Sequence, residues 1–221
     1  PGVVGAPSAN IASASYQTFK NAAGVKDRPT MIYFGSMGGM IHAVNAHTMK
    51  EEWAFVPPSF QTSLKNQLTT PWAGFDGTVV VRDVQLSKLA GDNSECPADA
   101  IGTSELFGYA ASKNLCRWRT VLVACFRRGF AGPSSGSIGH GCVALDVTKP
   151  TDTTWATGGA PFSFLWEFND RSPQDTSIRD RIGFTTGEPI IGTVFVDTGS
   201  STSDAPLDGE TAPAKVYNSS S

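Results

Sequence analysis

Hydrophobic residues in this chain occur in short runs separated by turn-forming residues, a pattern that predicts many short β-strands. The first two runs, residues 31–35 and 40–45, are rich in aliphatic and aromatic side chains. Between them lies Ser-Met-Gly-Gly, and a glycine-containing turn between two such runs is typical of a β-hairpin. The sequence therefore predicts a hairpin over residues 31–45.

Other runs predict further strands and one short helix. Residues 2–5 predict a brief lead-in strand before a polar, Ala/Ser-rich stretch, and residues 51–55 predict a strand centred on Trp53. Two prolines end that strand, because proline cannot donate to a sheet ladder. Residues 59–68 predict a short helix. Later strands are predicted at residues 118–125, 142–147, 164–168 and 189–196.

The predicted strands form an internal repeat. Three segments recur about 100 residues later: 32–34 as 121–123, 42–45 as 143–146, and 52–55 as 165–168. Each copy reads as strand, hairpin, strand, turn and Trp-bearing strand, which is the order of a propeller blade. A blade cannot bury both of its apolar faces alone, so blades occur in rings of about four to eight. The predicted fold class is therefore all-β, a β-propeller fragment of two to three blades with long loop insertions.

The repeat also divides the chain into predicted parts. Residues 1–30 form a lead-in strand and linker, and residues 31–221 form a partial propeller. We place blade-like units at 31–83 and 118–168, the start of a further blade at 187–221, and surface insertions at 84–115 and 126–141. Because two blades cannot close a ring and the chain starts with Pro1, we expect a piece of a longer, processed protein.

Composition narrows the classes of function. The net charge is −3, so there is no basic field for a phosphate backbone, and nucleic acid is not an expected partner. No apolar run approaches the roughly 20 residues that a membrane-spanning helix needs. Charged residues make up only 17% of the chain, beside 23 Gly and 14 Pro, which favours short strands over long solvated helices.

The four cysteines predict disulfides rather than a zinc site. No two of them have the C-x-x-C spacing of zinc ligands; they are Cys96, Cys116, Cys125 and Cys142. An even number of cysteines in a Gly/Ser-rich chain fits an oxidising compartment. Of the three possible pairings we favour Cys125–Cys142 at facing ends of two strands, with Cys96–Cys116 closing the loop between them. Four reduced, buried thiols are the alternative.

Two short motifs match catalytic patterns in letters only. Residues 197–200, Asp-Thr-Gly-Ser, resemble the aspartic-protease turn, but the sequence holds no second copy to complete a dyad. Residues 132–136 match G-x-S-x-G, yet a nucleophile elbow needs a strand before it and a helix after it, and both flanks are predicted loop. We interpret both motifs as turns.

Histidine and tryptophan positions favour structural roles. His42 lies mid-strand and is expected to point inward with a hydrogen-bond partner, while His47 and His140 lie in a turn and a loop. Their spacing is not that of metal ligands. Trp53 and Trp166 are expected to pack between blades. We therefore predict no catalytic, cofactor-binding or metal-binding residue in this segment, and no enzyme activity.

Longer strings resemble the PilC/PilY family of type IV pilus tip adhesins, and the resemblance runs to about residue 192. Matching strings are Ile-Tyr-Phe-Gly at 32–35, Gly-Met-Ile-His-Ala-Val-Asn-Ala at 39–46, Glu-Trp-Ala-Phe-Val-Pro at 52–57, Gly-Cys-Val-Ala-Leu-Asp-Val-Thr-Lys-Pro at 141–150, and Gly-Glu-Pro-Ile-Ile at 187–191. The turn at residues 36–38, Ser-Met-Gly, departs from the family's polar pair. The family's calcium loop has no counterpart here, because Asp197, Asp204 and Asp208 are spaced differently.

The resemblance implies a quinoprotein-like propeller at the cell surface or outside the cell, at a pilus tip or in the outer envelope. It implies minor pilins of the tip complex and a host or abiotic surface as partners, and roles in attachment and pilus extension. A calcium site is implied only elsewhere in the parent protein. One alternative is a quinoprotein-like dehydrogenase on the same propeller, and another is a purely structural scaffold in a fibre or envelope complex.

Overall fold

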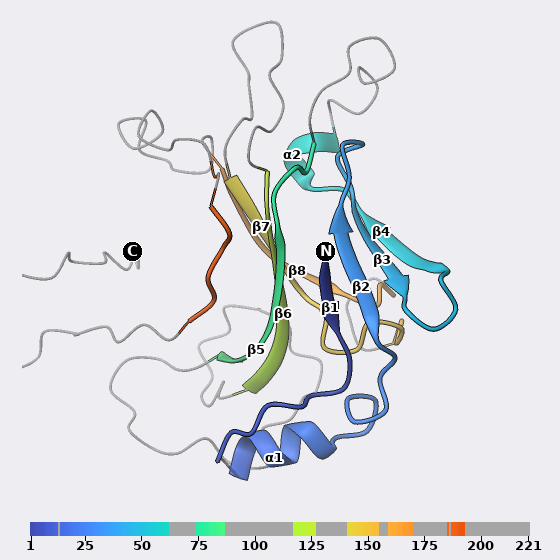
Figure 1. Cartoon of the computed structure of the whole chain (residues 1–221), viewed down its shortest axis with the longest axis vertical. Coiled ribbons are helices and arrows are strands. Elements are labelled where there is room, and N and C mark those ends of the chain that lie inside the picture. Colours follow the sequence, from blue (N-terminus) through green and yellow to red (C-terminus); the bar gives the residue numbers. More distant parts are fainter. Residues whose placement is uncertain are drawn as a thin grey trace, which may run out of the picture.

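The computed structural model describes residues 1–12, 14–61, 74–86, 117–126, 141–154, 159–169, 185 and 187–192. In these residues the chain forms two four-stranded antiparallel sheets packed face to face, with two short helices (Figure 1). The prediction of an all-β fold is confirmed at this level.

The first sheet has the strand order β1-β2-β3-β4, and each strand is antiparallel to the next. Its strands are β1 (Gly2–Val4), β2 (Met31–Gly35), β3 (Ile41–Asn45) and β4 (Glu51–Phe55). The predicted hairpin joins β2 to β3, with the Ser36 amide donating to the Met40 carbonyl at 2.9 Å. Gly39 closes the turn at φ 81°, a conformation that glycine adopts without steric cost.

The second sheet repeats this arrangement in the order β5-β6-β7-β8. Its strands are β5 (Val79–Leu86), β6 (Arg117–Cys125), β7 (Gly141–Asp146) and β8 (Ser163–Asn169). Residues 187–192 lie beside this sheet on the side away from the first sheet (Figure 1). The part of the predicted strand 189–196 that the structure describes, residues 189–192, is not a strand; Ile191 packs on the sheet through its side chain instead.

Two strands belong to other sheets than the sequence grouping implies. We assigned residues 1–30 to a lead-in, but β1 pairs with β2 and is the edge strand of the first sheet. We also placed residues up to 83 in the first unit, yet β5 pairs with β6 in the second sheet. The repeat covers the last three strands of each sheet. The first strand of each sheet lies outside it: the sequence predicts β1 only as a lead-in and predicts no strand at residues 79–86, where β5 forms.

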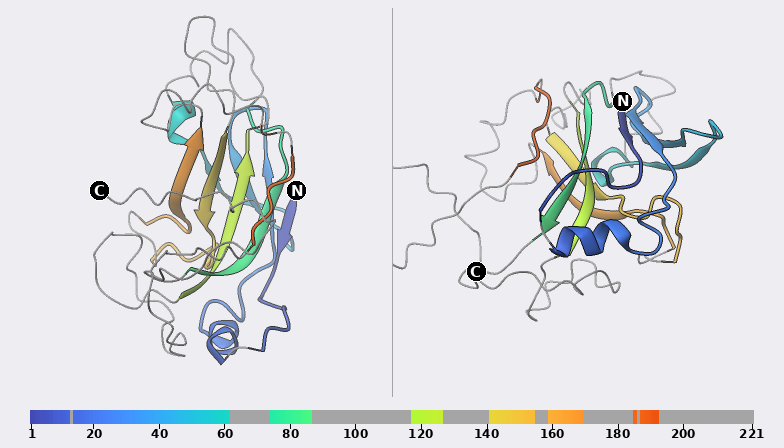
Figure 2. Two further views of the ribbon diagram at one scale, coloured as in Figure 1. Left: turned by 90° about the vertical axis from the view of Figure 1, so that its left-hand side faces the viewer. Right: turned by 60° about the horizontal axis from the view of Figure 1, so that its bottom comes forward.

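The helices differ from the prediction as well. Helix α1 (Ala14–Asn21) forms in a stretch predicted to be polar linker, and it lies at one end of the sheets (Figure 2). It is held against the second sheet by aromatic packing, since the ring centroids of Tyr16 and Phe19 lie 4.6 and 6.5 Å from that of Trp118. Helix α2 (Pro58–Gln61) begins where the helix 59–68 was predicted, and residues 62–68 lie outside the described part.

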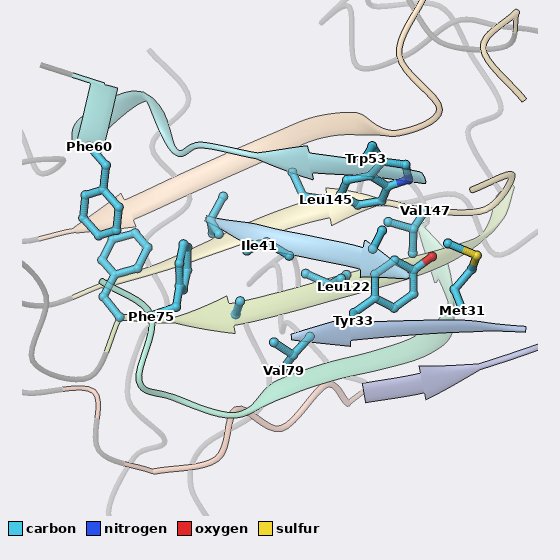
Figure 3. Packing of buried hydrophobic residues seen from close by; sticks show 14 residues of the cluster. Met31, Tyr33, Ile41, Trp53, Phe60, Phe75, Val79, Leu122, Leu145 and Val147 are labelled. Carbon is cyan, nitrogen blue, oxygen red and sulfur yellow. The ribbon is translucent and has the colours of Figure 1, made fainter. Parts of the chain in front are cut away.

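The main hydrophobic core fills the space between the two sheets, and α2 closes one end of it (Figure 3). Because strands are two-faced, alternate residues of β2, β3 and β4 supply one wall, and β5, β6 and β7 supply the other. The largest fully buried side chains of this core are Met31, Tyr33, Ile41, Phe60, Leu122, Phe126, Val143, Leu145 and Val147.

The cross-strand register confirms the repeat between the sheets for two of its three segments. Ala43 pairs with Trp53, Ala144 pairs with Trp166, and the ladder shifts immediately after both alanines. The first segment is shifted by one residue, because the register aligns Tyr33 with Val123 rather than with Leu122. Residues of β6 are buried on both faces and form a continuous apolar run, so the sequence did not mark their register.

Candidate functional site

Trp53 joins the two sheets, as its predicted packing role requires. Its side chain is only 8% exposed, and its ring lies 4.5 Å from Phe162 and 5.8 Å from Tyr33. The indole Nε1–H donates to the Pro150 carbonyl at 3.0 Å, in the turn that follows β7. Because a buried indole needs a partner for its N–H, this bond fixes where the Trp53 ring sits on the second sheet.

Trp166 occupies the same register position in the second sheet, but its surroundings differ. It lies on the face directed away from the first sheet and is 45% exposed, while its neighbour Phe168 is 47% exposed. Within the described residues Trp166 therefore does not pack between sheets as predicted. We call this surface the outer face of the second sheet; it comprises Val121, Val123, Cys142, Ala144, Leu165, Trp166 and Phe168.

The outer face corresponds, position by position, to the surface that the first sheet uses for packing. Pairing aligns Met31 with Val121, Tyr33 with Val123, Ile41 with Cys142, Ala43 with Ala144, Trp53 with Trp166, and Phe55 with Phe168. In the first sheet these residues bury themselves against the second sheet. The second sheet thus presents the same kind of apolar surface, with two aromatic rings half exposed.

A buried arginine, Arg28, joins the two sheets at the end opposite helix α2. The Arg28 side chain is 2% exposed, and its Nε donates to the Gly5 carbonyl at 2.7 Å. Its Nη1 donates to the Thr120 hydroxyl at 2.5 Å and to the Thr148 carbonyl at 3.1 Å. These bonds connect the chain before the first hairpin to β6 and to the turn after β7.

Asp83 supplies the charge that balances this arginine. Its Oδ1 lies 3.6 Å from Arg28 Nη2 and accepts from the Thr120 hydroxyl at 2.7 Å, and its Oδ2 accepts from the Tyr16 hydroxyl at 2.9 Å. Burial and the adjacent carboxylate raise the pKa of Tyr16 to about 12, so the phenol stays protonated and donates. No sequence pattern marks this cluster, because its members are far apart in the chain and share no motif.

Asp146 and Asn45 perform the same turn-capping role in the two sheets. Asp146 Oδ1 accepts from the backbone N–H of Thr148 at 3.0 Å and from its hydroxyl at 2.6 Å, and Asp146 Oδ2 lies 3.4 Å from Arg119 Nε. Burial raises the pKa of Asp146, and Arg119 and Thr148 offset part of that rise. Asn45 Oδ1 accepts from two backbone N–H groups at 3.0 and 3.2 Å in the exposed turn after β3.

This contrast predicts a pH effect on stability. Because the pKa of Asp146 is raised in the folded chain, the folded state binds the proton more tightly than the unfolded state, and the free energy of unfolding falls as pH rises through that window. In Asp146→Asn the amide oxygen can still accept the hydrogen bonds from Thr148, but the side chain no longer titrates. In urea titrations from about pH 4 to about pH 7, the wild type should lose stability relative to this variant. Asp152→Asn is the exposed control: the hydrogen bonds from Thr154 lower the pKa of Asp152, so the wild type should not lose stability relative to this variant as pH rises. A pH-independent difference for Asp146→Asn would contradict the assignment.

His42 has the expected hydrogen-bond partners but not the expected direction. Ile41 and Ala43 occupy the buried face of β3, so His42 lies on the face away from the second sheet, stacked on Phe34 at 5.1 Å. Its Nε2 lies 2.9 Å from Ser36 Oγ, and its Nδ1 lies 2.6 Å from Glu51 Oε2. The three side chains come from the turn after β2, from β3 and from β4.

The order serine, imidazole, carboxylate is that of a hydrolase triad, which invites a catalytic interpretation. The Ser36 hydroxyl also lies 3.4 Å from the Met40 carbonyl within its own turn. The Ser36 carbonyl is used in that turn too, because it accepts from the amides of Gly39 and Phe75. We interpret the array as a structural tie across β2, β3 and β4.

A chemical probe separates the two interpretations. We expect a fluorophosphonate to leave Ser36 unlabelled, because the array ties strands together rather than activating the hydroxyl. We also expect Ser36→Ala to lower the free energy of unfolding by about 1 kcal/mol, the loss of one hydrogen bond. The test compares the intact masses of the wild type, of Ser36→Ala and of the exposed control Ser8→Ala after labelling. Stoichiometric labelling that Ser36→Ala or His42→Ala abolishes would contradict the structural interpretation.

The predicted Cys125–Cys142 disulfide is present and joins directly paired residues of β6 and β7. Several features that the sequence singled out lie outside the described residues. These are Cys96, Cys116, His140, residues 132–136, Asp197, and most of the predicted insertions 84–115 and 126–141. His47 lies in the exposed turn after β3. Among the described residues, no three His, Cys, Asp or Glu side chains are grouped as metal ligands, and no helix is long and apolar enough to cross a membrane.

Two curated proteins resemble the chain. The type IV pilus biogenesis factor PilY1 of Pseudomonas aeruginosa is 28% identical over 185 residues, which cover 81% of this chain and 11% of that protein. The PilY1 homolog of Xylella fastidiosa is 30% identical over 162 residues, covering 69% of this chain and 10% of the relative. The chain belongs to the PilY1-type pilus factors.

The PilY1 relationship covers a small part of the relatives, since the chain spans about a tenth of their length. A solved structure, the C-terminal domain of P. aeruginosa PilY1, is 25% identical and covers 86% of this chain and 28% of that one, with a TM-score of 0.49. No protein-family model matches the chain.

Proposed function

We propose that this chain is a binding and assembly module of a type IV pilus biogenesis factor and has no catalytic activity. The observation that carries the proposal is its similarity to two proteins named as type IV pilus biogenesis factors. The Cys125–Cys142 disulfide supports a place outside the reducing cytosol, at the cell surface or the pilus tip. The net charge of −3 supports protein or surface partners rather than nucleic acid.

The two sheets serve, in this proposal, as consecutive blades of a β-propeller. Support comes from their shared strand order, from the paired Ala43–Trp53 and Ala144–Trp166 positions, and from the ladder shift at the same place in both. A sheet with two apolar faces is stable only between neighbours, which is how blades pack in a ring. The rigid ring would present its loops to minor pilins and to the surface that the cell adheres to.

The test is purification of the full-length protein from its native envelope, under conditions that retain its partners. We expect pilin-like subunits to co-purify, and we expect the absorption spectrum to show no bound quinone. A quinone, together with dye-coupled oxidation of alcohols or sugars, would instead establish the dehydrogenase alternative. Purification without any pilin-like subunit would contradict the assembly role.

A second assay distinguishes an adhesin from a purely structural scaffold. Cells with equal numbers of surface pili are compared for attachment, with and without substitutions in the predicted insertions 84–115 and 126–141. An adhesin predicts that attachment per pilus falls while pilus number stays constant. If attachment per pilus is unchanged, the chain acts only as a scaffold.

A further inference from the structure

We propose that a buried water molecule bridges Asp146 Oδ2 and Ser163 Oγ across strands β7 and β8, and that it fixes the turn through which the second sheet contacts the first. Water suits this site because the two oxygens share a small partner that both donates and accepts hydrogen bonds. The inference goes beyond the proposed function and is independent of it, because it concerns the inside of the second sheet alone.

Two buried side-chain oxygens on neighbouring strands define the site. Asp146 is 1% exposed and Ser163 is 6% exposed. Within the described part of the chain, neither Asp146 Oδ2 nor Ser163 Oγ makes a hydrogen bond. Buried polar atoms of native proteins are nearly always hydrogen-bonded to protein or to ordered water. Two such oxygens on adjacent strands therefore point to one shared water.

The strand register brings the two oxygens within the span of a single water. Asp146 and Ser163 are directly paired in the antiparallel ladder of β7 and β8, so their side chains lie on the same face of the sheet. The Cβ atoms of such a pair are about 4.5–5.5 Å apart. Each O–H···O bond is about 2.7–2.8 Å long, so one water joins oxygens up to about 5.5 Å apart. Both side chains are short, which keeps their oxygens within reach of the same water.

The site offers three hydrogen-bond partners, the usual number for a buried water. The water donates to Asp146 Oδ2 and accepts from the Ser163 hydroxyl. Arg119 Nε, which lies 3.4 Å from Asp146 Oδ2, is close enough to donate to the same water. A hydrogen bond to Oδ2 also stabilises the charged carboxylate, which burial disfavours.

The charges around the site favour water over a metal ion. The carboxylate of Asp146 is already paired with the guanidinium of Arg119. A cation bound at Oδ2 would lie next to that guanidinium and be repelled by it. Among the described residues, no three His, Cys, Asp or Glu side chains are grouped as metal ligands.

The water affects the contact between the sheets through the other oxygen of Asp146. Asp146 Oδ1 accepts from the backbone N–H and the hydroxyl of Thr148. The Thr148 carbonyl accepts from Arg28 Nη1. Two residues further on, the Pro150 carbonyl accepts from the Trp53 indole N–H. Holding Asp146 from the side of β8 therefore holds the turn that both of these inter-sheet bonds reach.

The first experiment compares Ser163→Ala with the wild type by hydrogen–deuterium exchange of the full-length protein at near-neutral pH. If the water is present, the substitution removes one of its partners, and the amides of residues 146–150 and 163–165 should exchange about fivefold faster. Removing a buried hydroxyl that has no partner is instead neutral or stabilising. Unchanged or slower exchange in these segments would overturn the inference. Ser8→Ala, at an exposed serine, is the control and should leave both segments unchanged.

A crystal structure of the full-length protein, at a resolution that shows ordered water, separates a bridging water from a direct bond. We expect a water peak about 2.5–3.0 Å from both Asp146 Oδ2 and Ser163 Oγ. A direct hydrogen bond between the two side chains, a metal ion at the site, or no water there would each contradict the inference. Neither measurement depends on pili, so failure here would leave the pilus role as it stands.

Discussion

Replacing Arg28 with methionine is expected to lower the free energy of unfolding of this chain by about 3–5 kcal/mol, the usual cost of breaking a buried ion pair from one side. Methionine fills a similar volume but donates no hydrogen bond. The Asp83 carboxylate would keep its bonds from Tyr16 and Thr120 but lose its cation, and the carbonyls of Gly5 and Thr148 would lose the Arg28 donor. Each buried group left without its partner adds to the loss.

The matched control for this prediction is Lys26→Met, two residues away. Lys26 is exposed and lies 3.9 Å from Asp27, and an exposed pair of this kind contributes little. Urea unfolding followed by tryptophan fluorescence should show a change within about 0.5 kcal/mol for Lys26→Met. Equal effects of the two substitutions would show that Arg28 does not anchor the sheets.

Trp53→Ala is the second substitution with a large expected effect, about 3–5 kcal/mol, the range for removing a buried aromatic side chain. The substitution opens a cavity beside Tyr33 and Phe162 and takes the hydrogen bond from the Pro150 carbonyl. Because these contacts join the two sheets, we also expect the unfolding transition to lose cooperativity.

Trp166→Ala is the control that shares the register position of Trp53. In this chain Trp166 is 45% exposed, so its removal should cost about 1 kcal/mol or less. Urea unfolding of both variants of the 221-residue chain, followed by circular dichroism, makes the comparison. Equal losses of stability would contradict the assignment of Trp53 to a buried face and of Trp166 to an exposed one.

Local patterns in the sequence predicted most of the strands. The hairpin of β2 and β3 follows from β-branched runs around a glycine turn, and Trp53 marks β4 in the way that Trp166 marks β8. The Cys125–Cys142 bridge was predictable because both cysteines end adjoining strands. For the strands the information lies within a few residues, where turn chemistry and side-chain alternation act, and for the bridge it lies in two neighbouring strands whose cysteines are 17 residues apart.

The features that the sequence did not reveal depend on contacts between distant segments. Helix α1 is stabilised by Trp118, a residue about 100 positions away, and its own segment is too polar to signal a helix. Arg28 meets Asp83 and Thr120 only after both sheets have formed. The sheet membership of β1 and β5 likewise depends on long-range pairing, which composition and spacing do not encode.

The most direct test of the central claim measures surface pili in cells that lack the full-length parent protein. We expect pilin sheared from the cell surface and twitching motility to fall sharply, while the total pilin in the cells stays constant. Re-expression of the intact protein should restore both, and Arg28→Met at equal envelope level should restore less than Lys26→Met. Unchanged surface pilin in the deletion strain would contradict a role in type IV pilus biogenesis.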